Sequence, residues 1–184
     1  MADHARLDTV IETERLMLRV PRGEDFEPWA EFMADPEVSR FLGGAQDRAM
    51  AWRNIAAMAG SWLLRGYGMF SFVEKASGRW IGRGGPWYPD GWPDREIGWG
   101  LTGAAQGKGF AREAAVACID FAFDTLGWSE VIHCIDPANA ASIRLAERLG
   151  SRRRGSGMLP PPISTMVDVY GQSCEEWRSR DREG

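Results

Sequence analysis

Apolar residues recur along the chain with two periods, one typical of amphipathic helices and the other typical of strands. The longer period predicts helices after Pro21 and over about 46–64, 108–126 and 139–149. Alternating or short apolar runs predict strands at residues 15–20, 69–74, 80–81, 96–101, 131–135 and 166–170. Because strands and helices are mixed around what can be one sheet, the expected fold class is α/β or α+β, with residues 1–184 forming a single domain.

The same pattern assigns individual side chains to the core or to the surface. Four tryptophans at helical or strand spacing are predicted to fill the core: Trp29, Trp52, Trp62 and Trp80. His133, in the middle of a predicted strand, is also interpreted as a packed core residue. The charged run Arg152–Arg154 is predicted to lie in a solvated loop.

Composition and charge narrow the class of protein. The chain has 184 residues, of which 44% are hydrophobic and 26% charged, the balance of a globular protein. Its net charge of −4 disfavours nucleic acid and anionic membranes as partners. No apolar run approaches the roughly 20 residues of a membrane span, and Met1–His4 leads into charged residues, so a cytoplasmic location is expected. Three cysteines and two histidines at no ligand spacing predict neither a disulfide framework nor a metal site.

Two glycine-rich stretches invite a phosphate-binding interpretation, and both depart from the common nucleotide motifs. Gly98–Gly103 has the spaced glycines of a dinucleotide site, but it does not open the first helix of a domain, so a nicotinamide or flavin site is rejected. Gly103–Lys108 is one residue too short for a triphosphate loop, and Gly109 stands where that loop needs Ser or Thr. A kinase or an ATPase is therefore disfavoured.

The turn Gln106–Glu113 lies between a predicted strand and the start of the long helix that follows it. Gly107 and Gly109 have no side chains to block a close approach, and backbone N–H groups at a helix start point outward with the positive end of the dipole. Such a turn can hold a pyrophosphate group. An ordinary strand-to-helix turn is the other interpretation that the local pattern leaves open.

Gln106, Gly109 and Ala111 fill a phosphate-binding signature in which Gln or Arg is followed by two residues, Gly, one residue, and then Gly or Ala. With this signature the chain resembles the GNAT superfamily of acyl-CoA-dependent N-acyltransferases over about residues 11–171. Further segments resemble its Rim-type branch, named for ribosomal-protein amino-terminal acetyltransferases; they are residues 13–19, 136–144 and 147–150.

This resemblance implies a central mixed, mostly antiparallel sheet, flanked by helices, whose fourth and fifth strands splay apart around the pantetheine arm of acetyl-CoA. Gly98 and Gly100 suit a kinked strand there. Acetyl-CoA is then the co-substrate, and no metal is implied. The residues implied to bind it are Trp99, Leu101, Gln106, Gly107, Lys108, Gly109, Phe110, Ala111, Arg112 and Asn139. For Asn139 the residues alone leave a second role open, because an Asn at this place is also a good helix cap.

Acyl transfer to an amine has two proton problems. An alkylammonium with a pKa of about 10 must lose a proton, and the departing CoA thiolate must be stabilised or protonated. Glu96, just after an aromatic loop, is the candidate base, directly or through water; a surface glutamate at a strand end is the alternative. Many members of the family use a tyrosine as the acid, and that position here is Ala146. The Rim-type resemblance suggests Ser142 instead; a hydroxyl satisfied within the first helical turn is the alternative.

Aromatic residues gather on the proline-rich loop that precedes Glu96. Trp87, Tyr88 and Trp92 are candidate walls of an acceptor pocket. The implied function is transfer of an acetyl group to a primary amine by direct attack; a protein amino terminus, an amino-sugar antibiotic, a polyamine and another metabolite all stay open as acceptor. A noncatalytic acyl-CoA-binding or sensing domain and a protein-interaction module are the alternative functions. Members of the family often form dimers, so a homodimer is one assembly to consider.

Overall fold

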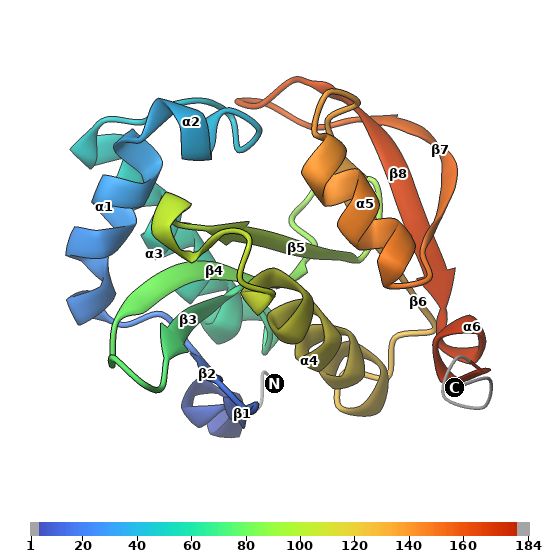
Figure 1. Ribbon diagram of the computed structural model, residues 1–184, viewed down its shortest axis with the longest axis horizontal. Coiled ribbons are helices and arrows are strands. Elements are labelled where there is room, and N and C mark those ends of the chain that lie inside the picture. The colour runs from blue at the N-terminus through green and yellow to red at the C-terminus, as the bar shows by residue number, and fades with distance from the viewer. Residues whose placement is uncertain (1–3, 180–184) are drawn as a thin grey trace.

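The computed structural model describes residues 4–179, whose strands form one eight-stranded sheet (Figure 1). In sheet order the strands are β1 (Val10–Glu12), β2 (Leu16–Arg19), β3 (Phe70–Glu74), β4 (Trp80–Trp87), β5 (Glu96–Leu101), β6 (Glu130–Ile135), β8 (Met166–Ser173) and β7 (Arg152–Met158). Neighbouring strands pair antiparallel except β5 and β6, which are parallel. The predicted fold class, with a mixed and mostly antiparallel sheet flanked by helices, is confirmed.

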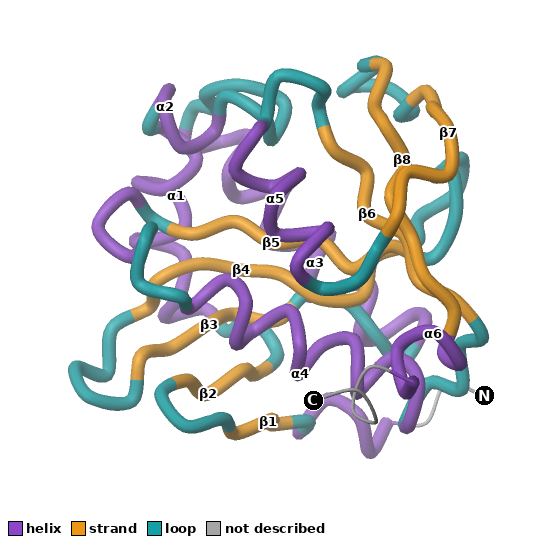
Figure 2. The backbone as a smooth tube through the Cα atoms, turned by 45° about the vertical axis from the view of Figure 1, so that its right-hand side comes forward, coloured by secondary structure: helices purple, strands orange, loops and turns teal. Residues whose placement is uncertain are grey.

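Helices lie against both faces of this sheet (Figures 1 and 2). The α-helices are α1 (Phe26–Ala34), α2 (Pro36–Ser39), α3 (Arg48–Arg65), α4 (Phe110–Asp124), α5 (Ala140–Arg148) and α6 (Cys174–Ser179). Short 3₁₀ helices occur at η1 (His4–Asp8), η2 (Gly23–Asp25) and η3 (Gly103–Ala105). α4 crosses one face over β4 and β5, whereas α1 and α3 pack together on the other side.

Helix α3 begins and ends at residues that are typical caps. Asp47 accepts a hydrogen bond from the N–H of Met50 at 2.8 Å, and Gly66 ends the helix with a φ of 73°. The buried side chains of α3 are Ala51, Ile55, Met58 and Trp62. The prediction that Trp52 fills the core is wrong, because this stripe starts one residue earlier and leaves Trp52 59% exposed. The other three predicted core tryptophans are buried: Trp29, Trp62 and Trp80.

Residues 152–154 lie in a strand, so the prediction of a loop is wrong, although the side chains are solvated as expected. β7 pairs with β8 at the edge of the sheet. Arg153 and Arg154 form ion pairs of 2.7 Å with Asp168 and Glu176. Charged side chains are common on edge strands because they discourage pairing with another chain. A run of charge therefore does not distinguish an edge strand from a loop.

The parallel strands β5 and β6 stay together only at one place. The single pair in register joins Glu96 to Ile132, and the two strands then diverge (Figure 2). On its other side β5 pairs with β4 along its whole length without a bulge. The predicted opening between these strands is therefore present, but the predicted kink at Gly98 and Gly100 is wrong.

Gly98 and Gly100 serve close packing instead. A Cβ atom at Gly98 would lie 3.0 Å from Cε of Met69, and one at Gly100 would lie 3.0 Å from Cζ of Phe32. Both distances are shorter than the 3.5 Å or so at which carbon atoms attract each other best. The absence of side chains on this part of β5 lets α1 and neighbouring groups approach the sheet.

Candidate active site

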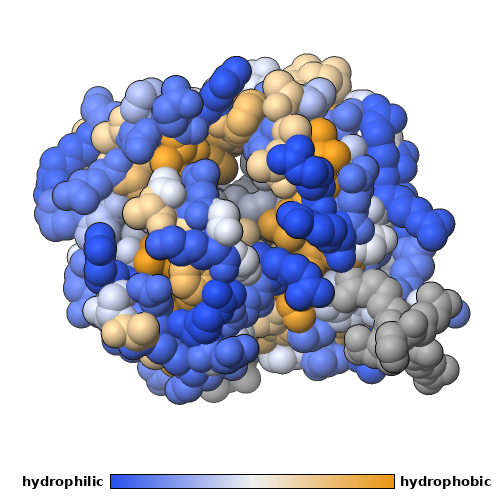
Figure 3. Space-filling view, in the orientation of Figure 1, coloured by the Kyte–Doolittle hydropathy of each residue, from blue (hydrophilic) through white to orange (hydrophobic). Residues whose placement is uncertain are grey.

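A cavity of about 440 Å³ lies where β5 and β6 separate. It is lined by the segment 41–46, α3, parts of β4, β5 and β6, the start of α5 and the segment 159–163. Figure 3 shows the molecule hollowed between α2 and α5, with hydrophobic surface on both sides. The predicted site residues that line the cavity are Trp87, Trp92, Glu96, Trp99, Asn139 and Ser142. The structure therefore brings the candidate base, the candidate acid and two candidate acceptor-binding tryptophans together.

Glu96 begins β5, and only 6% of it is exposed. Its Oε1 accepts a hydrogen bond from the N–H of Cys134 at 3.0 Å, and its Oε2 accepts one from Nε1 of Trp92 at 2.5 Å. The side chain thus satisfies a backbone group of β6 that has no backbone partner on β5. Burial raises the pKa of Glu96 to about 7, although the two hydrogen bonds and the charge of Arg83 act in the opposite direction. Near neutral pH the group is therefore divided between its acid and base forms, as suits a general base.

His133 holds the other side of the opening. Its Nδ1 lies 2.7 Å from the carbonyl oxygen of Ile97, and its Nε2 lies 3.0 Å from Oγ of Ser151. A carbonyl oxygen only accepts, so Nδ1 carries the proton and Nε2 accepts from the serine hydroxyl. Burial lowers the pKa of His133 to about 4, which keeps the ring neutral. The predicted core histidine is confirmed, and both ring nitrogens are occupied.

The backbone of β5 turns alternate residues toward the opening. The carbonyl of Ile97 faces His133, so the backbone N–H and C=O groups of Trp99 and Leu101 point to the same side of β5. The carbonyl of Leu101 accepts a hydrogen bond from Nε2 of Gln106 at 3.1 Å. Within the described residues, β6 offers Trp99 no strand pairing. The Trp99 peptide is therefore available to an extended ligand between the strands.

Asn139 and Ser142 meet at the start of α5. Oδ1 of Asn139 accepts a hydrogen bond from the N–H of Ser142 at 3.1 Å, so Asn139 is an N-cap. Oγ of Ser142 accepts a 3.3 Å hydrogen bond from Nε1 of Trp99, which ties α5 to β5. Ala146, at the position where a tyrosine acid is common, is fully buried. Ser142 is thus the hydroxyl of this helix that lines the cavity.

The turn before α4 has the form of an anion cradle. Gly107 and Gly109 have φ values of 74° and 84°, a conformation that glycine adopts without strain. Gly109 is the N-cap and no side chain caps the helix, so the first N–H groups of α4, from Phe110 onward, have no helical acceptor. These groups sit at the positive end of the helix dipole. The turn follows the opposite end of β5 from Glu96 and does not line the cavity.

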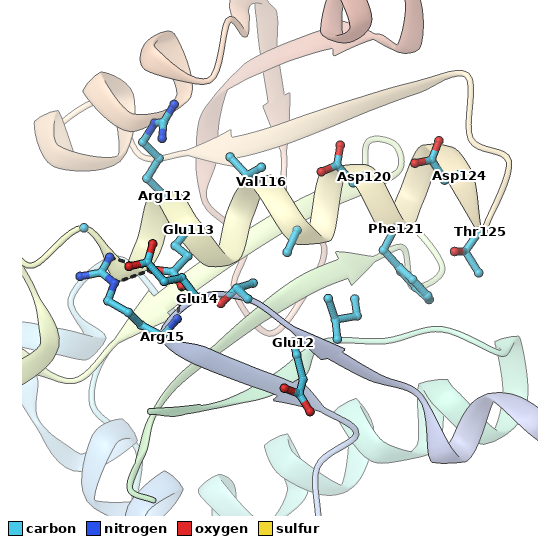
Figure 4. A pocket seen from close by; sticks show the side chains of 14 residues that line it. Glu12, Glu14, Arg15, Arg112, Glu113, Val116, Asp120, Phe121, Asp124 and Thr125 are labelled. Carbon is cyan, nitrogen blue, oxygen red and sulfur yellow. Dashed lines mark hydrogen bonds and ion pairs between the residues drawn. The ribbon is translucent and has the colours of Figure 1, made fainter. Parts of the chain in front are cut away.

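Arg15 braces this turn from the side (Figure 4). Its Nη1 donates to the carbonyl of Lys108 at 2.9 Å, its guanidinium pairs with Glu113 at 2.7 Å, and it lies 4.5 Å over the ring of Phe110. These groups lie at one end of an open groove between α4 and the β1–β2 strands, whereas Arg112 points away from Arg15. The brace joins residues about a hundred positions apart, so no local pattern predicts it.

The proline-rich loop brings two of its three aromatic residues to the cavity. The rings of Trp87 and Trp92 meet edge to face with centroids 6.5 Å apart. Tyr88 does not line the cavity; its ring lies beside the guanidinium of Arg95, and its carbonyl accepts a hydrogen bond from Arg65. The structure therefore leaves Tyr88 outside the acceptor wall that the sequence predicts.

For two residues that line the cavity, no sequence pattern predicts this position. Arg83 is 6% exposed, and it stands among glycines, where no hydrophobic period shows which way a side chain points. Gln46 follows Gly43, Gly44 and Ala45 in the segment between α2 and α3. Both reach the cavity only through the packing of distant segments.

The described residues contain neither a metal-binding cluster nor a helix that could span a membrane. Over residues 4–179, no cluster of three or more His, Cys, Asp or Glu side chains could hold a metal ion. In the same range, no helix combines the length and hydropathy needed to cross a membrane.

Comparison with known proteins identifies the class. A family model described as an acetyltransferase (GNAT) domain matches residues 15–152. YkkB from Bacillus subtilis strain 168, described as uncharacterized, is 31% identical over 152 residues, which cover 77% of this chain and 84% of YkkB. The uncharacterized N-acetyltransferase p20 of Bacillus licheniformis is 33% identical over 147 residues, 78% of this chain and 82% of p20.

The crystal structure of an acetyltransferase from Agrobacterium tumefaciens strain C58 is 32% identical and has a TM-score of 0.78, covering 89% of this chain and 94% of that one. The fold and these matches together define an acetyltransferase. The chain belongs to the acetyltransferase (GNAT) family.

More distant structures show the fold alone. A ribosomal-protein-serine acetyltransferase structure from Vibrio cholerae, itself described as putative, has a TM-score of 0.74 at 20% identity, covering 91% of this chain and 98% of that one. The aminoglycoside acetyltransferase AAC(6')-Ib, in complex with coenzyme A, has a TM-score of 0.71 at 16% identity, with coverages of 90% and 99%. Their acceptors differ while their folds agree. The Rim-type branch therefore stays a prediction.

Proposed function

We propose that this chain is an N-acetyltransferase domain that transfers the acetyl group of acetyl-CoA to a primary amine by direct attack. The observation that carries the proposal is the position of Glu96. Its buried carboxylate, with a pKa raised to about 7, lies where β5 and β6 separate and lines one cavity with Trp99. A base at this place can deprotonate an amine that approaches a thioester held between the strands.

Two parts of the chain fit acetyl-CoA, which supplies the acetyl group as a thioester. The gap beside β5 presents the Trp99 peptide and the N–H of Leu101 to the pantetheine arm, and Asn139 lies at the start of α5 beside this gap. The turn formed by residues 106–112 presents backbone N–H groups that suit a pyrophosphate. In this turn Gln106 acts by fixing the end of β5, because its side chain is bound to Leu101.

Groups that line the cavity then carry out proton transfer and stabilise the developing charge. Glu96 accepts the proton of the acceptor ammonium, directly or through water, so that the neutral nitrogen can form the new C–N bond. The N–H of Trp99 polarises the carbonyl oxygen as negative charge develops on it. As the C–S bond breaks, Ser142 donates a hydrogen bond to the departing thiolate, and the proton that the new amide nitrogen releases passes through solvent to this thiolate, so that CoA leaves as the thiol.

Free CoA thiol, measured with acetyl-CoA and a panel of primary amines, tests the proposal. Thiol release that depends on the amine, with an acetylated amine as product, supports it. A noncatalytic acyl-CoA-binding domain would bind acetyl-CoA in a thermal-shift assay without releasing thiol. The buried, titratable carboxylate of Glu96 in the cavity favours the enzyme over the noncatalytic binding domain.

Trp87→Ala should raise KM for the acceptor amine by about tenfold or more, because a large aromatic wall of the cavity is removed. The Kd for acetyl-CoA should stay the same, since the turn before α4 is separate from this wall. Trp52→Ala is the matched control, because Trp52 is exposed on α3 and does not line the cavity. Equal acceptor KM values for both variants would remove Trp87 from the acceptor wall.

A further inference from the structure

Unsatisfied polar atoms gather in the cavity. Within residues 4–179, the buried side-chain atoms without a hydrogen-bond partner are Gln46 Oε1, Arg83 Nε and Gln172 Oε1. The first two belong to residues that line the same cavity, although they come from different segments of the chain. Buried polar atoms are nearly always satisfied in folded proteins, so two in one cavity indicate groups that a ligand completes.

Arg83 is a buried cation without a paired carboxylate among the described residues. Within residues 4–179 its Nη1 donates a hydrogen bond to the sulfur of Met69 at 2.7 Å, and the guanidinium lies 5.9 Å from the centroid of the Trp29 ring. Burial lowers the pKa of Arg83 to about 10, and the charge of Glu96 opposes this effect. The guanidinium is therefore still charged at neutral pH.

Arg19, another buried arginine, has the carboxylate partner that Arg83 lacks. Arg19 is also 6% exposed, but both of its Nη atoms bind the carboxylate of Asp25, at 2.8 and 2.7 Å. Arg19 has the paired carboxylate that a buried charge requires. Arg83, buried to the same extent, lacks one and faces a cavity.

The acidic side chains around the cavity are otherwise engaged. Asp90 pairs with Arg65 at 2.6 Å, and Asp136 accepts a hydrogen bond from the N–H of Ala138 at 2.8 Å. Glu96 is held by its own two hydrogen bonds; its charge acts on Arg83, but no hydrogen bond or ion pair joins the two side chains. None of these carboxylates binds the buried Nε of Arg83, so an anionic group of the ligand can supply its partner.

The positions of Arg83 and Glu96 set the form of that ligand. Arg83 pairs in register with Gly100, four residues along β5 from Glu96, so the two backbones are separated by about 13 Å along the strand. The two side chains shorten this separation, yet they present opposite charges at two points of one cavity. An acceptor that fits both points carries a cationic amine and an anionic group on one molecule.

We propose, on the basis of the function proposed above, that the acceptor is an aminocarboxylate whose carboxylate pairs with Arg83 while its amine faces Glu96. The planar guanidinium suits a carboxylate. The Oε1 atom of Gln46 can accept a further hydrogen bond only from the amine of such an acceptor, because a carboxylate has no donor. Polyamines and amino-sugar antibiotics, which carry several positive charges and no anionic group, are disfavoured by the charge of Arg83.

The test compares wild-type kcat/KM for pairs of acceptors in which a carboxylate is replaced by its uncharged carboxamide, together with two further amines. The aminocarboxylates are β-alanine, 4-aminobutyrate and 6-aminohexanoate, each paired with its carboxamide; 3-aminopropylphosphonate and spermidine complete the set. At least one carboxylate should exceed its amide by about 10- to 150-fold, the range for hydrogen bonds to a charged group. Equal rates, or a preference for amides or spermidine, would overturn the proposal. A preference for the phosphonate alone would replace carboxylate by a phosphate-like group and so contradict it.

Arg83→Met should bring the carboxylate-to-amide ratio to about one. Arg53→Met is the matched control, because it removes an exposed arginine that lines the same cavity and should leave the ratio unchanged. An equal loss in both variants would show a general effect of charge and contradict the pairing. If Arg83→Met does not fold, Arg83→Lys, which keeps the charge but loses the fork, should reduce the ratio, and the wild-type comparison stands without any variant.

A binding measurement separates this proposal from the proposed function. Hexanoate and hexanamide are each titrated into the wild-type protein with CoA present. Saturable binding of hexanoate that Arg83→Met abolishes supports the anion site, even if no amine releases thiol. Acetylation of amines without any preference for carboxylates would leave the acetyltransferase in place and overturn the anion site. Equal binding of the two probes would also count against it.

Discussion

Glu96→Gln should lower kcat by about 100- to 10,000-fold, the usual contribution of a positioned general base. The glutamine has nearly the same shape, but it cannot take a proton, and it keeps only one acceptor for the two donors that Glu96 binds, the N–H of Cys134 and Nε1 of Trp92. The Kd for acetyl-CoA should change little, because its phosphate turn lies at the other end of β5. Steady-state kinetics and equilibrium binding measure the two effects separately.

The pH profile distinguishes a base from a structural residue. For the wild-type protein kcat/KM should rise through a pKa of about 7, and in Glu96→Gln this rise should be absent while the acceptor's own titration remains. Glu130→Gln is the matched control, since Glu130 is exposed at the start of β6. A wild-type profile with no titration near pH 7, or full activity of Glu96→Gln, would remove Glu96 from the mechanism.

The raised pKa of Glu96 also makes the folded state less stable as pH rises. Burial raises the folded-state pKa of Glu96 from 4.5 to about 7, so the folded chain binds this proton more tightly than the unfolded chain. The stabilisation is therefore complete below about pH 4.5 and is lost as pH rises to about 7, by up to about 3 kcal/mol. The free energy of unfolding of the wild-type protein, relative to Glu96→Gln, should fall across this window in chemical denaturation. Parallel curves would show that the carboxyl group titrates as it does in the unfolded chain.

Gly109→Trp should raise the Kd for acetyl-CoA by at least about 100-fold. The indole would stand on the turn that presents the N–H groups of α4, and hydrogen bonds from such groups to a charged phosphate are worth about 1.5–3 kcal/mol each. A side chain would also strain the backbone, because φ at this position is 84°. Isothermal titration with CoA measures the loss directly.

Gly127→Trp is the control for backbone strain. Gly127 has a φ of 67°, a Cβ atom added there would meet no atom within 4 Å, and the residue follows the other end of α4. Both variants should lose similar stability, of about 1–2 kcal/mol, but only Gly109→Trp should lose CoA binding. Retention of tight CoA binding by Gly109→Trp would contradict the cradle assignment.

The parts of the site that could be predicted are those in which function lies in a short stretch of chain. The turn at Gly107 and Gly109 is such a case, because a positive φ and a helix start are both local properties. Glu96 could be named because it lies between an aromatic loop and a strand. Its burial and its bonds to β6 could not be predicted, because Cys134 is 38 positions away.

The wrong predictions also concern features that long-range packing decides. A shift of one residue in the buried stripe of α3 decides whether Trp52 or Ala51 faces the core, and both choices satisfy the helical period. The strand at Arg152–Met158 carries edge charges that the sequence pattern cannot separate from a loop. In each case the local pattern allows two arrangements and long-range packing selects one.

The sequence by itself determined the order of most elements, the mixed fold class and the phosphate-type turn, because hydrophobic period and glycine conformation act over a few residues. Only the tertiary structure decided what the cavity contains. It brought Arg83 of β4 and Gln46 of the segment before α3 into the same cavity as Glu96 of β5, and it left Tyr88 outside. The physical reason is that burial and pairing of charge depend on which segments pack together, and neither can be read from neighbours along the chain.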